Sequence, residues 1–361
     1  MGFLSKLFGK SEKTATPKGF EELMVREIRS LSPDTVEIYF EIPNTVKPKY
    51  TFVPGQYVNV HVTIDGKDYR RSYSICSEPG APLAIAVKAV DKGIVSTYLN
   101  TQLDQGSYLW ISSPEGRFVL NGEKNIVAIA AGSGITPIIS MAKSIEKSAD
   151  TSIELFYGNK TQTDVLFKEE LKAFTKTNTT YFFTKETVAG AQVGRITKES
   201  FTEIIKANLS ILKADGFYIC GPEDMIFGIK EALELFGVAK EKVHFELFTT
   251  PTAAANQTVP VAAEGDFKGD ANVTVILDGE EFTFKAGSEG RTILDNLIND
   301  GADAPYSCRG GVCSSCRAKV IEGSVKMGLN YTLTDKEIAD GYVLTCQSHP
   351  TSEKVKISYD V

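Results

Sequence analysis

The sequence predicts a multidomain fold: an antiparallel β-barrel, then an α/β domain built on a parallel sheet, then a small α+β domain. The chain of 361 residues is too long for one ordinary hydrophobic core. The spacing of its apolar runs changes after residue 122, and a stretch rich in Ala, Thr and Pro follows residue 248. We therefore expect a flexible tail at 1–19, the barrel at 20–122, the α/β domain at 123–248, a linker at 249–271 and the last domain at 272–361.

The first domain is predicted from short β-rich runs, which include VEIYFEI, YVNVHVTI and LAIAVKAV. Turns that contain Pro and Gly separate these runs, as in PGQY and SEPGAP. Dense short strands with such turns are typical of a barrel.

Apolar runs of strand length define the second domain, namely NIVAIAA, SIELFYG, TYFFT, GFYICG and KVHFELF. Helix-like stretches, VLFKEELKAF and EDMIFGIKEALELFG, lie between them. Buried strands that alternate with helices indicate a parallel sheet with helices on both faces.

The segment TTPTAAANQTVPVAAEGDFKGD has no amphipathic period, so we interpret it as a linker. Few contacts are expected to cross such a boundary. The last domain opens with a predicted hairpin, VTVILDGEEFTFKA, followed by one helix, TILDNLINDG, and a loop that holds three cysteines.

Composition and charge exclude several classes of protein. The net charge is −7 and there is no basic stripe, which argues against nucleic acid as a partner. No stretch approaches the roughly 18 apolar residues of a membrane span, and the N-terminus lacks the continuous apolar core of a secretory signal. We therefore expect a cytoplasmic protein without a membrane partner, in which six cysteines favour metal binding or redox chemistry over disulfides.

The cysteines of the last domain have a characteristic spacing. The loop SCRGGVCSSC contains Cys308, Cys313 and Cys316, and the next cysteine is Cys346. A C-x4-C-x2-C pattern with a distant fourth cysteine is the plant-type spacing for a 2Fe-2S cluster, which four thiolates bind. These four residues are the predicted metal ligands.

Two other interpretations of the loop are open from the sequence. Structural zinc also accepts four thiolates, but it usually gathers them as two C-x2-C pairs. Buried, unreactive cysteines are expected in apolar runs, as we expect for Cys76 and by default for Cys220, whereas this loop is rich in Ser, Arg and Gly. Gly310 and Gly311, with positive φ available, would let the backbone wrap closely around an inorganic core.

Two turns of the α/β domain follow apolar strands and open helices. GSGITP follows NIVAIAA, and CGPEDM follows GFYI. Such turns cradle a pyrophosphate with backbone N–H groups, and two of them at one sheet edge define a crevice for a dinucleotide. A tight turn without a ligand is the alternative for each motif alone. The candidate residues are Gly132, Gly134, Thr136, Pro137, Cys220, Gly221 and Pro222.

The barrel contributes the motif RRSYS. Arg71 is a candidate for a phosphate contact, Tyr73 for stacking on an aromatic ring and Ser74 for a hydrogen bond to it, although R-x-Y-S also fits ordinary strand alternation. Gly93 and Ser96 stand at a predicted helix start, which is either an anion site or an N-cap.

In this order, RRSYS, the turn that opens the helix of KGIVSTYL, GSGITP and CGPEDM resemble the ferredoxin–NADP reductase superfamily over the first two domains. The resemblance implies that Arg71, Tyr73 and Ser74 hold FAD. It also implies that Gly93 and Ser96 receive the FAD pyrophosphate, and that GSGITP and CGP bind the nicotinamide nucleotide.

The same resemblance implies which residues lie close to the reacting rings. Cys220 is expected near the nicotinamide, and Glu246 and Phe248 are expected to close over the flavin. The residues expected to be catalytic are Tyr73, Ser74, Cys220 and Glu246.

NADPH is favoured over NADH as the electron donor. The segment GNKTQT, just after SIELFY, offers Lys160 and Thr161 and no immediate acid to bind a ribose 2′-hydroxyl. Arg195 in GRIT is a candidate for a second phosphate contact. Each of these side chains also fits a solvated surface residue, so NADH is the alternative.

The segment PYSCRGGVCSSCRAKVIEGSV resembles plant-type ferredoxins, which implies a β-grasp fold. The full order of domains, with GLNYTLTDKE and GYVLTCQ, resembles the phenylacetyl-CoA epoxidase reductase family of bacterial phenylacetate degradation. That resemblance implies electron transfer from NADPH to FAD, to the 2Fe-2S cluster and then to a diiron oxygenase partner. The alternatives are another acceptor (a Rieske oxygenase, a desaturase or a ferredoxin) and a non-catalytic electron carrier or redox sensor.

Overall fold

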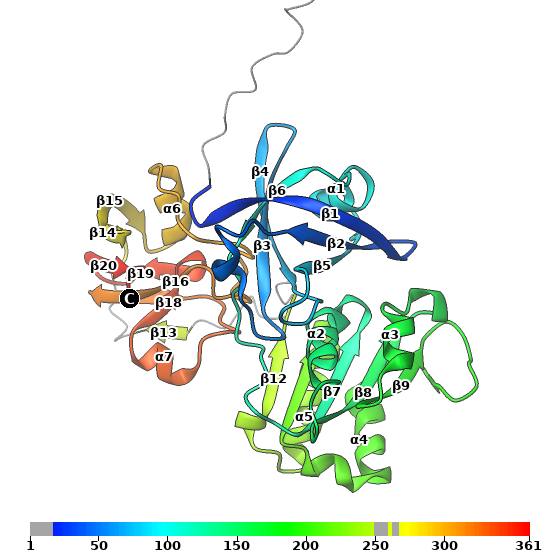
Figure 1. Cartoon of the computed structure of the whole chain (residues 1–361). Coiled ribbons are helices and arrows are strands. Elements are labelled where there is room, and N and C mark those ends of the chain that lie inside the picture. The colour runs from blue at the N-terminus through cyan, green and yellow to red at the C-terminus, as the bar shows by residue number, and fades with distance from the viewer. Residues whose placement is uncertain (1–16, 249–258, 262–266) are drawn as a thin grey trace, which may run out of the picture.

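Three parts of the chain meet at one junction in the computed structural model, which describes residues 17–248, 259–261 and 267–361 (Figure 1). The barrel contacts both other parts, and the cysteine-containing part lies beside it. Residues 1–16 of the predicted tail and residues 249–258 and 262–266 of the predicted linker lie outside the described residues.

Six antiparallel strands form the barrel in the order β4-β3-β6-β1-β2-β5. A bridge between Ile75 and Ile85 joins the two ends of this sheet, β4 and β5, and so closes it. The elements are β1 Phe20–Ser32, β2 Thr35–Glu41, η1 Lys47–Tyr50, β3 Tyr57–Ile64, β4 Lys67–Ser74, β5 Ala84–Lys88, α1 Ile94–Thr101 and β6 Tyr108–Ser112.

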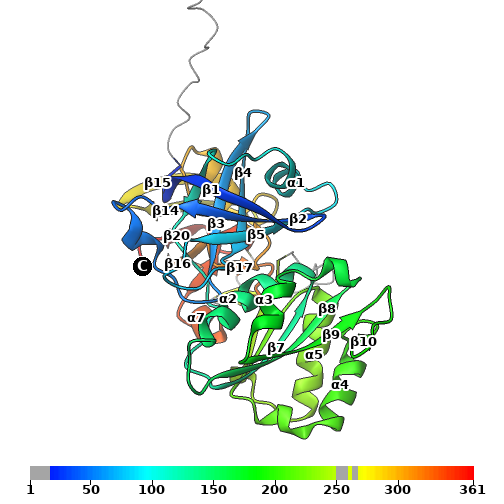
Figure 2. The ribbon, with the colours of Figure 1, turned by 45° about the vertical axis from the view of Figure 1, so that its right-hand side comes forward.

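The second part has a parallel sheet in the order β10-β9-β8-β7-β11-β12. Helices α2 and α3 cover the face toward the barrel, and α4 and α5 cover the other face (Figure 2). The strand order reverses beside β7, so a crevice forms at the carboxyl ends of β7 and β11. The strands are β7 Asn125–Ala131, β8 Ser152–Asn159, β9 Thr177–Phe183, β10 Gln192–Val193, β11 Gly216–Cys220 and β12 Val243–Glu246. The helices are η2 Gly132–Gly134, α2 Ile135–Ile145, η3 Gln162–Asp164, α3 Lys168–Ala173, α4 Lys198–Ala207, η4 Leu209–Lys213, α5 Glu223–Leu235 and η5 Lys240–Lys242.

The last part combines a five-stranded sheet, β15-β14-β20-β16-β18, with a three-stranded one, β13-β17-β19. Its predicted hairpin is present: Asp278 and Gly279 both have positive φ, as a two-residue turn requires. The strands are β13 Val259–Val261, β14 Asp270–Leu277, β15 Glu280–Gly287, β16 Arg317–Glu322, β17 Val325–Met327, β18 Tyr342–Leu344, β19 Ser348–Pro350 and β20 Lys354–Ser358. The helices are α6 Ile293–Asn299, α7 Asp335–Ala339 and η6 Thr345–Gln347. The predicted fold class, a barrel, a parallel α/β sheet and a ferredoxin-like α+β part, is confirmed.

Part of the predicted linker is paired structure. Val259–Val261 pairs antiparallel with β17, and β14 begins at Asp270 rather than after residue 271. A three-residue edge strand is held by backbone hydrogen bonds and is too short to show a sequence period, which is why the sequence did not reveal it.

The sequence predicts few contacts to the last part, and the structure shows which polar side chains do cross to it. The buried guanidinium of Arg70 on β4 lies 2.5 Å from the carboxylate of Asp303. Arg117, at the end of the barrel, lies 2.5 Å from Glu337 of α7. The cysteine-containing part is therefore docked on the barrel by polar side chains.

Candidate functional site

The fold gathers four cysteines that are distant in sequence. Cys308, Cys313 and Cys316 lie in the loop between α6 and β16, and Cys346 lies in η6. Their thiols contact one another in two pairs, Cys308 with Cys313 and Cys316 with Cys346. Cys308 is partly exposed, whereas the other three are buried, as is Cys76 outside the loop.

The loop backbone turns N–H groups toward these sulfurs. The amide of Gly310 donates to Cys308 Sγ at 3.3 Å. The hydrogen bond between Cys308 and Cys313 lowers the pKa of the Cys308 thiol and raises that of the Cys313 thiol. In the second pair, the hydrogen bond lowers the pKa of Cys346 and raises that of Cys316. Backbone N–H donors directed at sulfur fit a centre made of anionic thiolates.

Gly311 is the position in this loop that requires glycine. Its φ is +74°, and a Cβ there would lie 2.6 Å from the carbonyl oxygen of Leu329. Gly310 does not have a positive φ, whereas Arg309 does, at 54°. The predicted need for glycine is thus confirmed at Gly311 only.

The arrangement of the cysteines fits a two-iron cluster. A structural zinc site needs four ligands around one metal. Two contacting pairs of thiols fit two irons, each bound by two thiolates.

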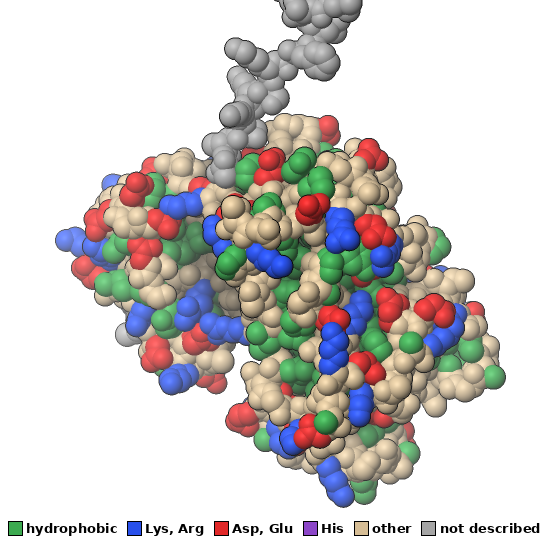
Figure 3. Space-filling view, in the orientation of Figure 1, with side chains coloured by type: hydrophobic (Ala, Val, Ile, Leu, Met, Phe, Trp, Pro, Cys, Tyr) green, Lys and Arg blue, Asp and Glu red, His purple; other side chains and the backbone are tan. Residues whose placement is uncertain are grey.

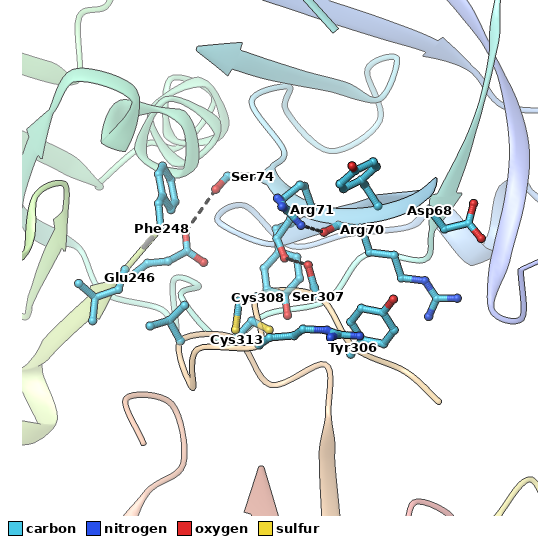
Figure 4. A pocket seen from close by; sticks show the side chains of 16 residues that line it. Asp68, Arg70, Arg71, Ser74, Glu246, Phe248, Tyr306, Ser307, Cys308 and Cys313 are labelled. Carbon is cyan, nitrogen blue, oxygen red and sulfur yellow. Dashed lines mark hydrogen bonds between the residues drawn. The ribbon is translucent and has the colours of Figure 1, made fainter. Parts of the chain in front are cut away.

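A cavity of about 580 Å³, called here the junction cavity, lies where the three parts meet (Figure 4). Its walls come from β4, from the chain at the end of β12 and from the cysteine loop. In the space-filling view, Lys and Arg side chains gather beside the hollow between these parts (Figure 3). The residues in its wall that matter for the chemistry are Arg71, Ser74, Glu246, Phe248, Cys308 and Cys313.

Three of the four predicted catalytic residues are close together. The hydroxyl of Ser74 donates to Glu246 Oε2 at 3.2 Å, and burial raises the pKa of Glu246 to about 8. Cys220 is paired in register with Glu246 at the end of β11 and is fully buried. Burial, with a smaller effect of the Glu246 charge, raises the pKa of the Cys220 thiol well above its usual value. Cys220 lies behind the cavity wall rather than in it.

A second cavity, of about 540 Å³, opens at the carboxyl ends of β7, β8 and β11 and is called here the crevice. Gly134 must be glycine, because a Cβ there would lie 2.1 Å from the carbonyl oxygen of Cys220. Phe248 lines both the crevice and the junction cavity. The predicted residues that line the crevice are Gly132, Gly134, Lys160, Arg195, Gly221, Pro222 and Phe248.

Several predicted binding residues besides Cys220 do not line either cavity. Thr136 and Pro137 are buried in the first turn of α2, where the hydroxyl of Thr136 donates to the carbonyl of Ser133. That turn packs inward on the sheet, which removes both side chains from the crevice. Tyr73 packs against the barrel core, so its stacking on a flavin stays a prediction.

The turn at Gly93 and Ser96 also lies outside both cavities. Gly93 is the N-cap of α1, and the Ser96 hydroxyl accepts from the amide of Val90 at 3.1 Å. The sequence left two interpretations open, an anion site and an N-cap, and these contacts are the local hydrogen bonds expected at the start of a helix. Binding of a pyrophosphate there stays a prediction.

Two residues were missed or misjudged from sequence. Asp164 lines the crevice with Lys160, although no nearby acid was expected. Its Oδ2 accepts hydrogen bonds from the amide and hydroxyl of Thr161, at 2.9 and 2.6 Å. Arg70 was missed for a physical reason. The alternation of side chains along a strand shows which residues share a face of the sheet, but it does not show which domain that face meets.

Models of three protein families match the chain in consecutive segments. They are the oxidoreductase FAD-binding domain at residues 22–120, the oxidoreductase NAD-binding domain at 128–231 and the 2Fe-2S iron-sulfur cluster binding domain at 275–351. The chain is 33% identical to a subunit of the 1,2-phenylacetyl-CoA epoxidase of Escherichia coli (strain K12), over 94% of this chain and 98% of that protein. The chain belongs to the iron–sulfur flavoprotein reductases.

Two further proteins are similar to the chain. The ferredoxin reductase component of 3-ketosteroid-9-alpha-monooxygenase from Rhodococcus rhodochrous is 29% identical, over 93% of this chain and 96% of that protein. The solved structure of phthalate dioxygenase reductase has a TM-score of 0.60 at 22% identity and covers 94% of this chain and 98% of its own, which shows a shared fold.

The reductase is an NAD(P)H-dependent oxidoreductase that uses FAD and a 2Fe-2S cluster, as its three domain matches show. Its residues fit these groups: the paired cysteines suit the cluster, the junction cavity is large and lined by Arg71, and the crevice holds two glycine turns. Within the described residues, no helix is long and apolar enough to cross a membrane.

Proposed function

We propose that this reductase oxidises NADPH and passes single electrons through its cluster to a diiron oxygenase of the phenylacetyl-CoA epoxidase type. One observation carries the order of the steps: Ser74 and Glu246 border the same cavity as Cys308 and Cys313 (Figure 4). A flavin bound in that cavity would convert a two-electron donation from nicotinamide into single electrons for the cluster.

The residues around the junction cavity have separate tasks in this proposal. Phe248 lies between the crevice and the junction cavity, so it covers the flavin position until a nicotinamide replaces it. The Ser74 hydroxyl and the Glu246 carboxyl offer a hydrogen bond and a proton at that position, since a carboxyl with a pKa of about 8 still holds its proton at neutral pH.

The preference for NADPH is supported by two cations in the crevice. Lys160 and Arg195 both line it and carry charges that suit the extra phosphate of NADPH. Asp164, the acid that would favour a ribose hydroxyl, has its Oδ2 engaged by Thr161.

The choice of acceptor is supported by similarity to the phenylacetyl-CoA epoxidase protein of Escherichia coli across nearly the whole chain, which includes the cysteine loop. A second candidate is a 3-ketosteroid 9-alpha-monooxygenase, because its reductase component is similar over almost the same length. Reconstitution decides between them: the purified reductase and NADPH are combined with each oxygenase, and product is measured. Product with the epoxidase alone supports the proposal, and product with the other oxygenase alone contradicts it.

The visible absorption spectrum distinguishes a flavin-dependent reductase from a protein that only carries electrons on its cluster. The purified chain should show flavin and cluster absorption, and both should bleach on addition of NADPH. Cluster absorption without flavin, or bands that NADPH leaves unchanged, would support the carrier interpretation.

A further inference from the structure

Arg70 is buried at the end of the junction cavity opposite Glu246 and Phe248, beside Tyr306 (Figure 4). Its side chain donates to the Asp303 carboxylate at 2.5 Å and to the carbonyl of Ala304 at 3.2 Å. The guanidinium also lies 4.8 Å from the ring centroid of Tyr306. All of these partners belong to the segment that leads into Cys308, so one barrel residue contacts three residues at the entry to the cysteine loop.

A hydroxyl contact continues from this anchor to the first cysteine. Ser72, two residues after Arg70 on β4, lies 2.7 Å from Ser307, oxygen to oxygen. Ser307 directly precedes Cys308. The strand that lines the junction cavity is thus hydrogen-bonded to the chain beside a cluster ligand.

The barrel holds the other side of the loop through Ser315, which lies between Cys313 and Cys316. The Ser315 hydroxyl donates to Glu115 Oε2 at 3.0 Å. The hydroxyl of Tyr57 and the amide of Asn59 each lie 3.3 Å from the same Ser315 oxygen. Glu115 is half-buried. Burial raises its pKa above the usual value, although the hydrogen bonds that it accepts act in the opposite direction.

These two sets of contacts are called here the loop anchors: Arg70 with Asp303 and Ala304, and Glu115 with Ser315. Interfaces between domains of one chain usually allow relative motion unless they are extensive. A buried guanidinium with fixed donors, however, specifies one geometry, because any shift leaves a buried charge unpaired. Electron transfer between two bound groups becomes slower as the distance between them grows, so a fixed geometry matters for the rate.

We propose that Arg70 and Glu115 are positioning residues, which fix the cysteine loop against the barrel so that electrons pass from the junction cavity to the cluster without movement of the last domain. The assignment rests on the proposed route from flavin to cluster. In RRSYS both arginines line the junction cavity, and Arg70 in addition binds the segment that precedes Cys308.

The test uses Asp303→Asn and Glu115→Ala, because neither residue lines either cavity. Asp300→Asn is the matched control, an exposed acid three residues from Asp303. In the full holoprotein, stopped-flow mixing with NADPH follows flavin bleaching and cluster reduction separately. We expect flavin reduction at the parent rate, cluster reduction slower by about tenfold in each variant, and no change in the control. Asp303→Glu should recover part of the rate.

Two further measurements distinguish positioning from damage. The electron paramagnetic resonance spectrum after chemical reduction should be that of the parent, which shows an intact cluster. Amide hydrogen exchange should rise at residues 303–307 in Asp303→Asn and stay unchanged in β14. Parent rates of cluster reduction in both variants, whether or not exchange rises, would overturn the inference. Absence of cluster reduction in the parent itself would instead remove the proposed route, and the inference with it.

Discussion

Glu246 shows how one side chain acquires its chemistry from burial. The sequence marked it only through a family resemblance, whereas the structure places its carboxyl against the Ser74 hydroxyl and raises its pKa to about 8. A carboxyl that keeps its proton at neutral pH is able to donate one, which an exposed glutamate is not.

This pKa has a consequence for stability. Between the usual pKa of 4.5 and about 8, the folded chain holds a proton at Glu246 that the unfolded chain has released. The stabilising contribution is therefore complete below pH 4.5 and is lost as the pH rises toward 8. Glu246→Gln should flatten the fall in the free energy of unfolding over this window, measured by urea denaturation at several pH values. An unchanged slope would show that another group titrates there.

Lys160 tests the choice of nucleotide. Lys160→Glu reverses a charge in the crevice and should raise the KM for NADPH by about tenfold more than the KM for NADH, because only NADPH carries the extra phosphate. Lys213→Glu, at an exposed lysine outside the crevice, should affect neither. Equal effects on the two nucleotides would argue against this role.

Tyr73 tests whether the family's stacking residue acts here. Tyr73→Ala should lower the FAD content of the purified chain, because the resemblance implies that an aromatic ring at this position stacks on the flavin. Tyr108→Ala removes an exposed barrel tyrosine and serves as the control. Full FAD content in the Tyr73 variant would assign the residue to the barrel core alone.

At the scale of elements, backbone geometry gives the cysteine loop a shape that fits the cluster. The positive φ of Gly311 brings the backbone to Leu329, and the loop amides face the sulfurs. The four thiols contact in pairs because η6 brings Cys346 to Cys316. The glycine-rich turn after β7 also depends on a close backbone approach. Because Gly134 has no Cβ, it packs directly against the carbonyl of Cys220 at the end of β11.

Cys313→Ser should separate the two halves of the reaction. Serine is a poor ligand for this cluster, so cluster absorption should fall while NADPH oxidation with a small artificial acceptor continues near the parent rate. Electron delivery to an oxygenase should be lost. Ser314→Ala, in the same loop, should keep both activities. If the Cys313 variant still drives the oxygenase at the parent rate, electrons leave from the flavin instead.

At the scale of the whole molecule, the three parts share one cavity, and this changes what truncation should do. A chain that ends at Phe248 loses the wall supplied by Tyr306, Cys308 and Cys313. It should bind FAD more weakly than the parent, because less of the flavin is enclosed. At saturating FAD it should still oxidise NADPH with an artificial acceptor, since the crevice, Ser74 and Glu246 remain. Parent affinity for FAD, measured by fluorescence titration, would show that the third wall is dispensable.

The sequence by itself determined the local features of this reductase. These features are the periods of strands and helices, the Asp278–Gly279 turn and the spacing of the four cysteines. Each can be predicted from a short segment, because it depends on backbone geometry and on neighbouring side chains. They were sufficient to predict the fold class and the cluster.

Only the tertiary structure decided how the parts meet. The pairing of Val259–Val261 with β17, the inward turn of Thr136 and the contact of Arg70 with Asp303 all depend on segments far apart in the chain. The physical reason is that the role of a side chain is set by what lies opposite it. Arg70 and Arg71 both line the junction cavity, but Arg70 donates to Asp303 of the neighbouring domain whereas Arg71 donates to the carbonyl of Arg70, and no local pattern distinguishes them.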